Sequence, residues 1–212
     1  TNAVNLVDGL DGLAAGIAAI SALCIGYVAY IHGHYIPTVA MMVIAGAALG
    51  FLPYNFHPAK IFMGDTGATF LGFILASLSI QGMFKLYAIV SFAVPFLILG
   101  IPIFDICFAI IRRLAKHQNP MKADRGHIHH RLIDMGFSQK QAVAITYMLT
   151  AMLGLAAVVL TSSGEGRALI LIGAVFVVGA IGFRMIFNKN SQRPAEPPEE
   201  TRKETKEKAE SK

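Results

Sequence analysis

A polar segment at residues 112–131 interrupts a chain that otherwise consists, up to residue 187, of long apolar runs. The segment holds six lysines or arginines and four of the chain's seven histidines. Apolar runs of about 17–25 residues can cross a bilayer as helices. Loops rich in Lys and Arg between such helices stay on the cytoplasmic side. The segment therefore predicts a cytoplasmic loop, and it sets the orientation expected for the rest of the chain.

The composition agrees with an integral membrane protein. Of the 212 residues, 55% are hydrophobic and only 15% are charged, whereas soluble domains carry about 25% charged residues. The net charge of +5 comes mostly from the polar loop and the C-terminal tail. We interpret this charge as attraction to anionic lipid headgroups, not as a sign of nucleic-acid binding. Cys24 and Cys107 are expected at different membrane depths, too far apart for a disulfide.

Six apolar runs predict an all-α integral membrane protein whose spans lie at residues 10–31, 37–52, 66–82, 86–111, 141–160 and 168–187. With the 112–140 loop cytoplasmic, alternation of the spans places the polar segments 1–9 and 53–65 on the same face. Both termini are then expected in the cytoplasm. The predicted domains are a membrane domain at residues 1–187 and a tail at 188–212, which lacks the apolar residues needed to fold.

The fourth apolar run contains features that are unusual within a membrane span. Pro95, Gly100 and Pro102 predict a kinked or broken helix, because proline lacks an amide and clashes with the carbonyl four residues earlier. Asp105 lies about two turns before the cytoplasmic end of this run and needs a partner there. Pairing with Arg112, roughly on the same face, and participation in a functional site are both open.

Acidic residues are rare outside the tail, and two of them, Asp8 and Asp11, lie at the cytoplasmic start of the first span. If the helix begins this early, their carboxylates share one helix face. A simple explanation is that they cap the helix and interact with its dipole. Two carboxylates together with Asn5 and neighbouring glycines favour a functional site instead.

A further carboxylate, Asp65, stands between Gly64 and Gly67 at the start of the third span. The glycines let the backbone approach a ligand closely. A carboxylate oxygen suits Mg²⁺, which typically binds through one or two carboxylates plus a substrate phosphate. A helix cap is again the alternative.

The polar loop ends in three histidines within four positions, with basic side chains on both sides: Lys122, Arg125, His127, His129, His130 and Arg131. Zinc is one interpretation, but no cysteine or glutamate lies near enough to complete a usual ligand set. A site for phosphates or a diphosphate is favoured. A loop that serves only to set topology would explain the arginines but not the histidines.

Together these segments place carboxylates, glycines and cations on one membrane face, which suits Mg²⁺-assisted phosphoryl transfer to or from a lipid. Two other classes compete with this interpretation. A transporter would place ionisable groups near the bilayer midplane, where only Asp105 is a candidate. A membrane scaffold would not need the three motifs.

The segments at residues 2–12, 62–67 and 127–131 resemble the signature segments of the polyprenyl-phosphate N-acetylhexosamine-1-phosphate transferases, glycosyltransferase family 4. The resemblance covers residues 1–187. It implies a multi-pass enzyme of the bacterial cytoplasmic membrane with its active site on the cytoplasmic face. Such an enzyme transfers GlcNAc-1-phosphate from UDP-GlcNAc to undecaprenyl phosphate and releases UMP, starting teichoic acid or other surface polysaccharide synthesis.

The resemblance also implies roles for individual residues. Asp8, Asp11 and Asp65 would be catalytic, and Asp65 and Asp8 would bind Mg²⁺, with Mn²⁺ as an alternative ion. The residues implied in substrate binding are Asn5, Arg125, His127, His129, His130 and Arg131. A homodimer is compatible with the family.

The form of the histidine segment bears on the branch of the family. His129 and His130 are followed here by Arg131, whereas the phospho-MurNAc-pentapeptide transferases of peptidoglycan synthesis typically show three consecutive histidines. The GlcNAc branch is therefore favoured and the peptidoglycan branch is the alternative.

The chain departs from the family pattern in one respect. Family members carry a paired-aspartate segment on an earlier cytoplasmic loop, and no Asp-Asp pair occurs in this sequence. We expect this chain to be the C-terminal portion of such an enzyme, and we expect this portion alone to be inactive.

Overall fold

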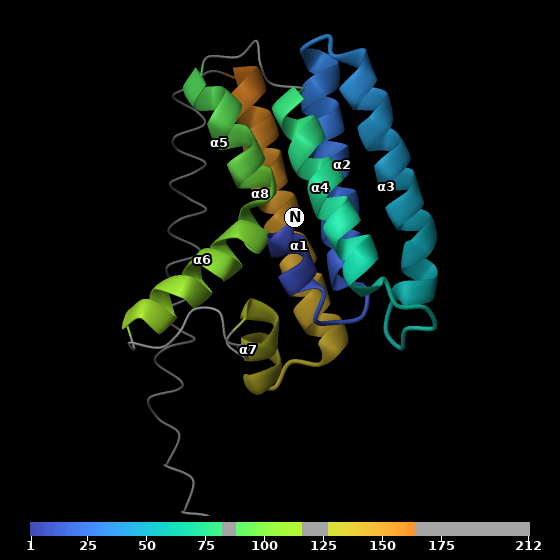
Figure 1. The fold of residues 1–212 in the computed structure, drawn as a ribbon, viewed down its shortest axis with the longest axis vertical. Coiled ribbons are helices and arrows are strands. Elements are labelled where there is room, and N and C mark those ends of the chain that lie inside the picture. Colours follow the sequence, from blue (N-terminus) through green and yellow to red (C-terminus); the bar gives the residue numbers. More distant parts are fainter. Residues whose placement is uncertain (82–87, 116–126, 164–212) are drawn as a thin grey trace, which may run out of the picture. The chain divides into compact units, whose positions relative to one another are not determined.

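The computed structural model describes residues 1–81, 88–115 and 127–163, and these form α-helices and no strands (Figure 1). They belong to the first of two compact units, Thr1–Val175. The predicted sixth span, the predicted tail and Arg125 lie outside the described residues. The helices are α1 Asn2–Val7, α2 Leu13–Ile31, α3 Tyr35–Asn55, α4 Gly64–Gln81, α5 Ala88–Ile98, α6 Gly100–Ala115, α7 Ile128–Asp134 and α8 Gln139–Ser163.

Three of the described helices, α2, α3 and α8, are long and apolar enough to cross a membrane. They coincide with the first, second and fifth predicted spans, and α4 occupies the place of the third. The all-helical membrane fold is therefore confirmed for this part of the chain.

The predicted break in the fourth span is also confirmed: α5 ends at Ile98 and α6 begins at Gly100. Pro102 has no amide to donate to the carbonyl of Ile98, four residues earlier. The hydroxyl of Ser21, on α2, donates to that carbonyl at 3.3 Å. A polar side chain of a neighbouring helix thus satisfies the backbone group that the proline leaves without a donor, as an apolar environment requires.

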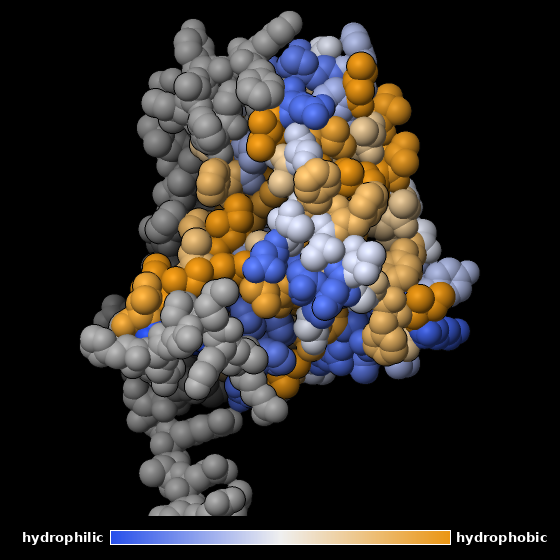
Figure 2. Space-filling view, in the orientation of Figure 1, coloured by the Kyte–Doolittle hydropathy of each residue, from blue (hydrophilic) through white to orange (hydrophobic). Residues whose placement is uncertain are grey.

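Helix α2 is the centre of the bundle. Its Ala18, Ala22, Ile25 and Val28 pack against α3, α4, α5 and α8 in one apolar cluster. About 67% of the residues in its apolar stretch are buried, against 22% in α3. Helix α3 exposes Ile36, Val39 and Val43, and apolar side chains cover much of that side of the molecule (Figure 2). Such a face suits contact with lipid.

The helices alternate in direction, so that the loop before α2, the connection between α3 and α4, and α7 lie at one end of the bundle (Figure 1). The turn between α2 and α3 lies at the other end. This arrangement brings the three motif-bearing segments together, as the alternation of spans predicted.

The prediction for Asp8 and Asp11 is wrong in one respect. They do not share a helix face, because α1 ends at Val7 and α2 begins at Leu13. Gly12 has a φ of +81°, in the left-handed region that glycine tolerates, and two glycines within five residues disfavour a continuous helix. The two carboxylates lie instead in the loop that connects α1 and α2.

Candidate active site

The loop at residues 8–12 is held in place by contacts to the backbone of Gly12. The side-chain oxygen of Asn55, at the end of α3, accepts the Gly12 amide at 3.1 Å. The Tyr147 hydroxyl, from α8, donates to the Gly12 carbonyl at 2.6 Å. Gly16 makes room for this tyrosine, since a Cβ there would overlap its ring. Helices distant in sequence therefore fix the loop that carries Asp8 and Asp11.

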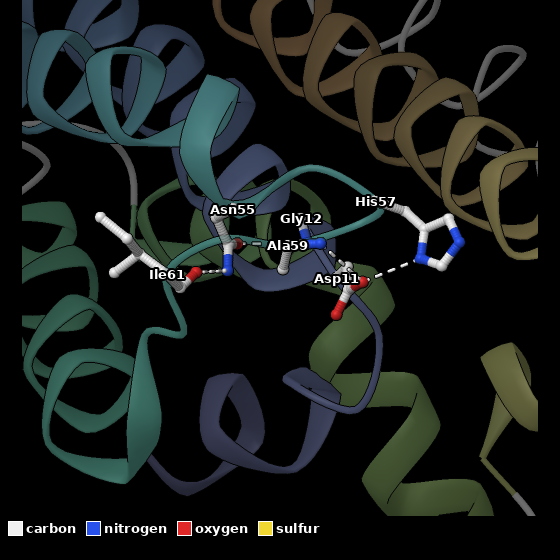
Figure 3. Close-up of polar contacts among 6 residues, drawn as sticks. All are labelled: Asp11, Gly12, Asn55, His57, Ala59 and Ile61. Carbon is white, nitrogen blue, oxygen red and sulfur yellow. Dashed lines mark hydrogen bonds and ion pairs between the residues drawn. The ribbon is translucent and has the colours of Figure 1, made fainter.

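Asp11 binds the connection between α3 and α4 (Figure 3). Its Oδ2 accepts a hydrogen bond from Nδ1 of His57 at 2.8 Å and another from the amide of Ala59 at 3.1 Å. Asn55 adds a second link by donating to the carbonyl of Ile61 at 2.9 Å. The Asp11 carboxylate thus holds the connection against the loop, and its predicted catalytic role stays a prediction.

Asp8 lies near enough to Asp65, in the first turn of α4, for their charges to interact. Burial, and secondarily the negative charge of Asp65, raise the pKa of the Asp8 carboxyl above its usual value. On α1, three residues before Asp8, the side-chain oxygen of Asn5 is buried and has no hydrogen-bond partner within the described part of the chain. Two neighbouring carboxylates and an unpartnered amide oxygen are the hard donors that Mg²⁺ prefers.

A cavity of about 160 Å³ opens beside Asp8. It is lined by both motif segments and by the end of α3, through Asp8, Gly9, Leu10, Asp11, Asn55, Phe62 and Met63. The first two predicted segments therefore line one cavity, and its lining includes both polar and apolar side chains.

The histidine segment joins this site through α7. His127 and His129 are buried; their rings are parallel within 2°, with centroids 5.7 Å apart. The His130 ring lies 4.3 Å from that of His129 and is tilted by 47°. His129 packs on Gly9, where a Cβ would lie 2.5 Å from its Nε2. The third predicted segment thus touches the loop of the first.

His129 is a neutral imidazole at physiological pH. Burial, with smaller contributions from the neighbouring His130 and His127, lowers its pKa to about 4, although Asp105 opposes the shift. The ring therefore contributes hydrogen bonding and shape to the site, and no positive charge.

The geometry gives no support to a zinc site at the histidines. The rings of His127 and His129 are parallel and stacked instead of converging on one point. Across residues 1–81, 88–115 and 127–163, no group of three or more His, Cys, Asp or Glu side chains could hold a metal ion. The Mg²⁺ interpretation needs only two protein carboxylates, because the substrate supplies phosphate oxygens.

Arg131 is oriented by α6. Its guanidinium lies 5.1 Å from the centroid of the Phe108 ring, within the range of a cation–π contact. The predicted role of Arg131 in substrate binding stays a prediction.

Asn55, His57, Asp105 and Tyr147 complete the site, and reasoning from the sequence did not assign them to it. The position of Asn55, a polar amide at the end of an apolar run, was only a weak indication that it belongs to the site. Asp105 was left between two interpretations; its carboxylate binds His127 and the amide of Ile128, both at 2.8 Å. Asp105, on α6, is thus hydrogen-bonded to the histidine segment.

Comparison with known proteins agrees with this site. Residues 1–83 match the family described as "Glycosyl transferase family 4". A Bacillus subtilis (strain 168) protein named "Probable undecaprenyl-phosphate N-acetylglucosaminyl 1-phosphate transferase" is 45% identical over 172 residues, covering 81% of this chain and 48% of the relative. The chain belongs to glycosyl transferase family 4. The matched region contains the Asp8 and Asp65 segments.

Two further relatives are less similar to this chain. A Mycolicibacterium smegmatis "Decaprenyl-phosphate N-acetylglucosaminephosphotransferase" is 37% identical over 202 residues, 85% of this chain and 49% of the relative. An Escherichia coli K12 "Undecaprenyl-phosphate alpha-N-acetylglucosaminyl 1-phosphate transferase" is 31% identical over 156 residues, 72% of this chain and 42% of the relative. The chain spans about half the length of the curated relatives it matches.

Proposed function

We propose that this protein transfers GlcNAc-1-phosphate from UDP-GlcNAc to undecaprenyl phosphate and releases UMP. The observation that carries the proposal is the convergence of three separated segments: Asp8 beside Asp65, and His129 against Gly9 of the Asp8 loop. The names of the relatives, which specify an N-acetylglucosaminyl phosphate and a polyprenyl phosphate, support the same reaction.

In this reaction an oxygen of the lipid phosphate attacks the phosphorus atom that carries the sugar. The P–O bond to the UMP phosphate breaks, and UMP leaves with the electron pair. Both substrates are anions, so the chain must position them and offset their charge. Asp8, Asp65 and Asn5 supply the oxygens that would hold Mg²⁺, or Mn²⁺ in its place. The bound ion would neutralise negative charge on the phosphates.

The histidine segment is proposed to hold the donor. His129 is buried beside Gly9 and neutral, so it can offer a hydrogen bond to the diphosphate or the sugar. His130 packs against it from the same short helix. Arg131 and Arg125 are proposed to add positive charge. The absence of a third consecutive histidine favours the GlcNAc donor over phospho-MurNAc-pentapeptide.

The topology is proposed as multi-pass, with six spans, both termini in the cytoplasm and the site on the cytoplasmic face of the bacterial membrane. The gathering of the motif segments at one end of α2, α3 and α8 supports it, because a lipid phosphate lies at the membrane surface. A transporter is disfavoured, since Asp105, its candidate midplane group, is bound by His127 and Ile128. A homodimer remains compatible with the proposal.

The experiment is kinetic and uses the full-length enzyme in detergent. UMP release is measured at varied UDP-GlcNAc and saturating undecaprenyl phosphate for wild type and for His129→Ala and His130→Ala. We expect kcat/KM for UDP-GlcNAc to fall about 10- to 100-fold, the usual cost of losing a positioned polar group. His34→Ala is the matched control. His34 follows the C-terminal end of α2, and the length of that helix places it roughly 28 Å from the Asp8 loop at the other end. Unchanged kcat/KM in both site variants would contradict the proposed donor site.

A further inference from the structure

Asp105 is a buried carboxylate, only 3% exposed, in a helix of a membrane protein. Burying a carboxylate is costly unless hydrogen bonds compensate for the lost water. Both of its oxygens accept such bonds: Oδ2 from Nδ1 of His127 and Oδ1 from the amide of Ile128, each at 2.8 Å. The carboxylate of α6 is therefore bound to the first residues of the histidine segment.

This pairing fixes the protonation pattern of the His127 ring. A carboxylate can only accept hydrogen bonds, so Nδ1 of His127 must carry the hydrogen. In the neutral ring, Nε2 is then the acceptor nitrogen. The bond to the Ile128 amide adds a second point of attachment, which orients the backbone as well as the ring.

The orientation of the His127 ring affects the site because the ring packs against His129. Its ring is parallel to that of His129 at 5.7 Å between centroids, and His129 rests on Gly9. A change in the angle of His127 would therefore move the ring that lies beside the Asp8 loop.

We propose that Asp105 is a positioning residue that sets the tautomer and orientation of His127 and, through the ring stack, the placement of His129 in the donor site. The kinetic effect expected from this proposal rests on the proposed function. The expected tautomer of His127 does not. Asp105→Asn is the informative change, because it keeps the shape and can still accept from the Ile128 amide. The amide nitrogen that it presents toward Nδ1 is a donor, which reverses the preferred tautomer.

The structural test is ¹⁵N NMR of the full-length enzyme labelled with ¹⁵N-histidine, with the His127 signals assigned by their loss in His127→Gln. We expect a protonated Nδ1 in wild type and a deprotonated Nδ1 in Asp105→Asn. A deprotonated Nδ1 in wild type would overturn the proposal. This result does not depend on which substrate the enzyme uses.

The kinetic test is a double-mutant cycle with UDP-GlcNAc. Asp105→Asn is expected to lower kcat/KM for UDP-GlcNAc about 10- to 100-fold, as loss of an orienting partner commonly does, and to leave KM for undecaprenyl phosphate unchanged. In a His127→Ala background the same change should have little further effect, because Asp105 acts through His127. Equal losses in both backgrounds would overturn the proposal.

Ser21→Ala is the matched control. It removes another buried side-chain hydrogen bond, to the carbonyl of Ile98 in the membrane interior. It should therefore report the effect of general destabilisation without a shift in the His127 signals. A wild-type enzyme that fails to release UMP from UDP-GlcNAc would refute the proposed function, while the NMR result would still decide the Asp105–His127 pairing.

Discussion

Gly9 and His129 are in direct contact, and a Cβ at residue 9 would lie 2.5 Å from Nε2 of the imidazole. This contact joins the aspartate loop before α2 to the histidine helix α7. Residue 9 must be glycine because there is no room for a Cβ. Its backbone conformation does not require glycine, since its φ does not lie in the left-handed region. The contact explains how a short loop and a distant helix form one site.

Gly9→Ala is therefore expected to displace His129 and lower UMP release about 10²-fold, since small misplacements of positioning groups can cost that much. The measurement is kcat/KM for UDP-GlcNAc in the full-length enzyme. Gly46→Ala is the control, because alanine is a better helix former than glycine and a Cβ at residue 46 meets nothing within 4 Å in the described structure. Equal activity of the two variants would contradict the account.

Asp8→Asn tests the proposed Mg²⁺ site without relying on catalysis. Burial and the charge of Asp65 raise the pKa of Asp8, so its ionised form is disfavoured in the folded protein without metal. The stability cost is absent below the ordinary pKa of 3.8 and is fully present above the raised folded-state pKa. The variant should therefore melt at a higher temperature than wild type in EDTA.

Added Mg²⁺ should raise the melting temperature of wild type and have a much smaller effect on Asp8→Asn. Asp11→Asn is the control, because the Asp11 carboxylate is bound by His57 and Ala59 and should not be needed for Mg²⁺ binding. An equal Mg²⁺-induced increase in melting temperature in wild type and Asp8→Asn would show that Asp8 does not bind the ion.

His129 should make stability depend on pH. Its folded-state pKa of about 4 lies below its ordinary 6.5, so its contribution is fully present above about pH 6.5. That contribution is lost as the pH falls toward 4. His129→Gln cannot titrate and should show a shallower loss of thermal stability over this window, whereas His34→Gln should behave as wild type. Identical pH profiles for wild type and His129→Gln would show that burial does not suppress protonation.

Tyr147→Phe tests the contact that holds the loop from α8. It removes the hydroxyl that donates to the Gly12 carbonyl at 2.6 Å and keeps the ring that fills the space beside Gly16. Loss of one such bond is expected to cost about 1 kcal/mol of stability and to lower kcat modestly. Tyr30→Phe, at an exposed position on α2, is the control. If Tyr147→Phe and Tyr30→Phe have the same stability and kcat, the contact between Tyr147 and Gly12 does not stabilise the loop.

Local features were predictable from the sequence. Apolar run length predicted α2, α3 and α8, and the lack of an amide at Pro102 predicted the break before α6. The early start of the first helix was considered and is wrong, because Gly9 and Gly12 favour a loop more strongly than the neighbouring apolar residues favour a helix.

The pairings within the site were not predictable in the same way. Asp105 binds a residue 22 positions away, and Asp11 binds one 46 positions away. Whether such groups meet depends on the packing angles of α6 and α3 against the bundle, which the periodicity of one helix does not contain. The sequence predicted which segments lie on one face, but not which atoms meet.

The most direct measurement follows the phosphate. Full-length enzyme is incubated with undecaprenyl phosphate, Mg²⁺ and UDP-GlcNAc that carries ³²P in the phosphate next to the sugar. We predict that the label moves into the lipid fraction as UMP is released, and that Asp65→Asn slows this transfer about 10²-fold or more. Label that stays in soluble UDP while the sugar moves to lipid, or full transfer by Asp65→Asn, would contradict this prediction.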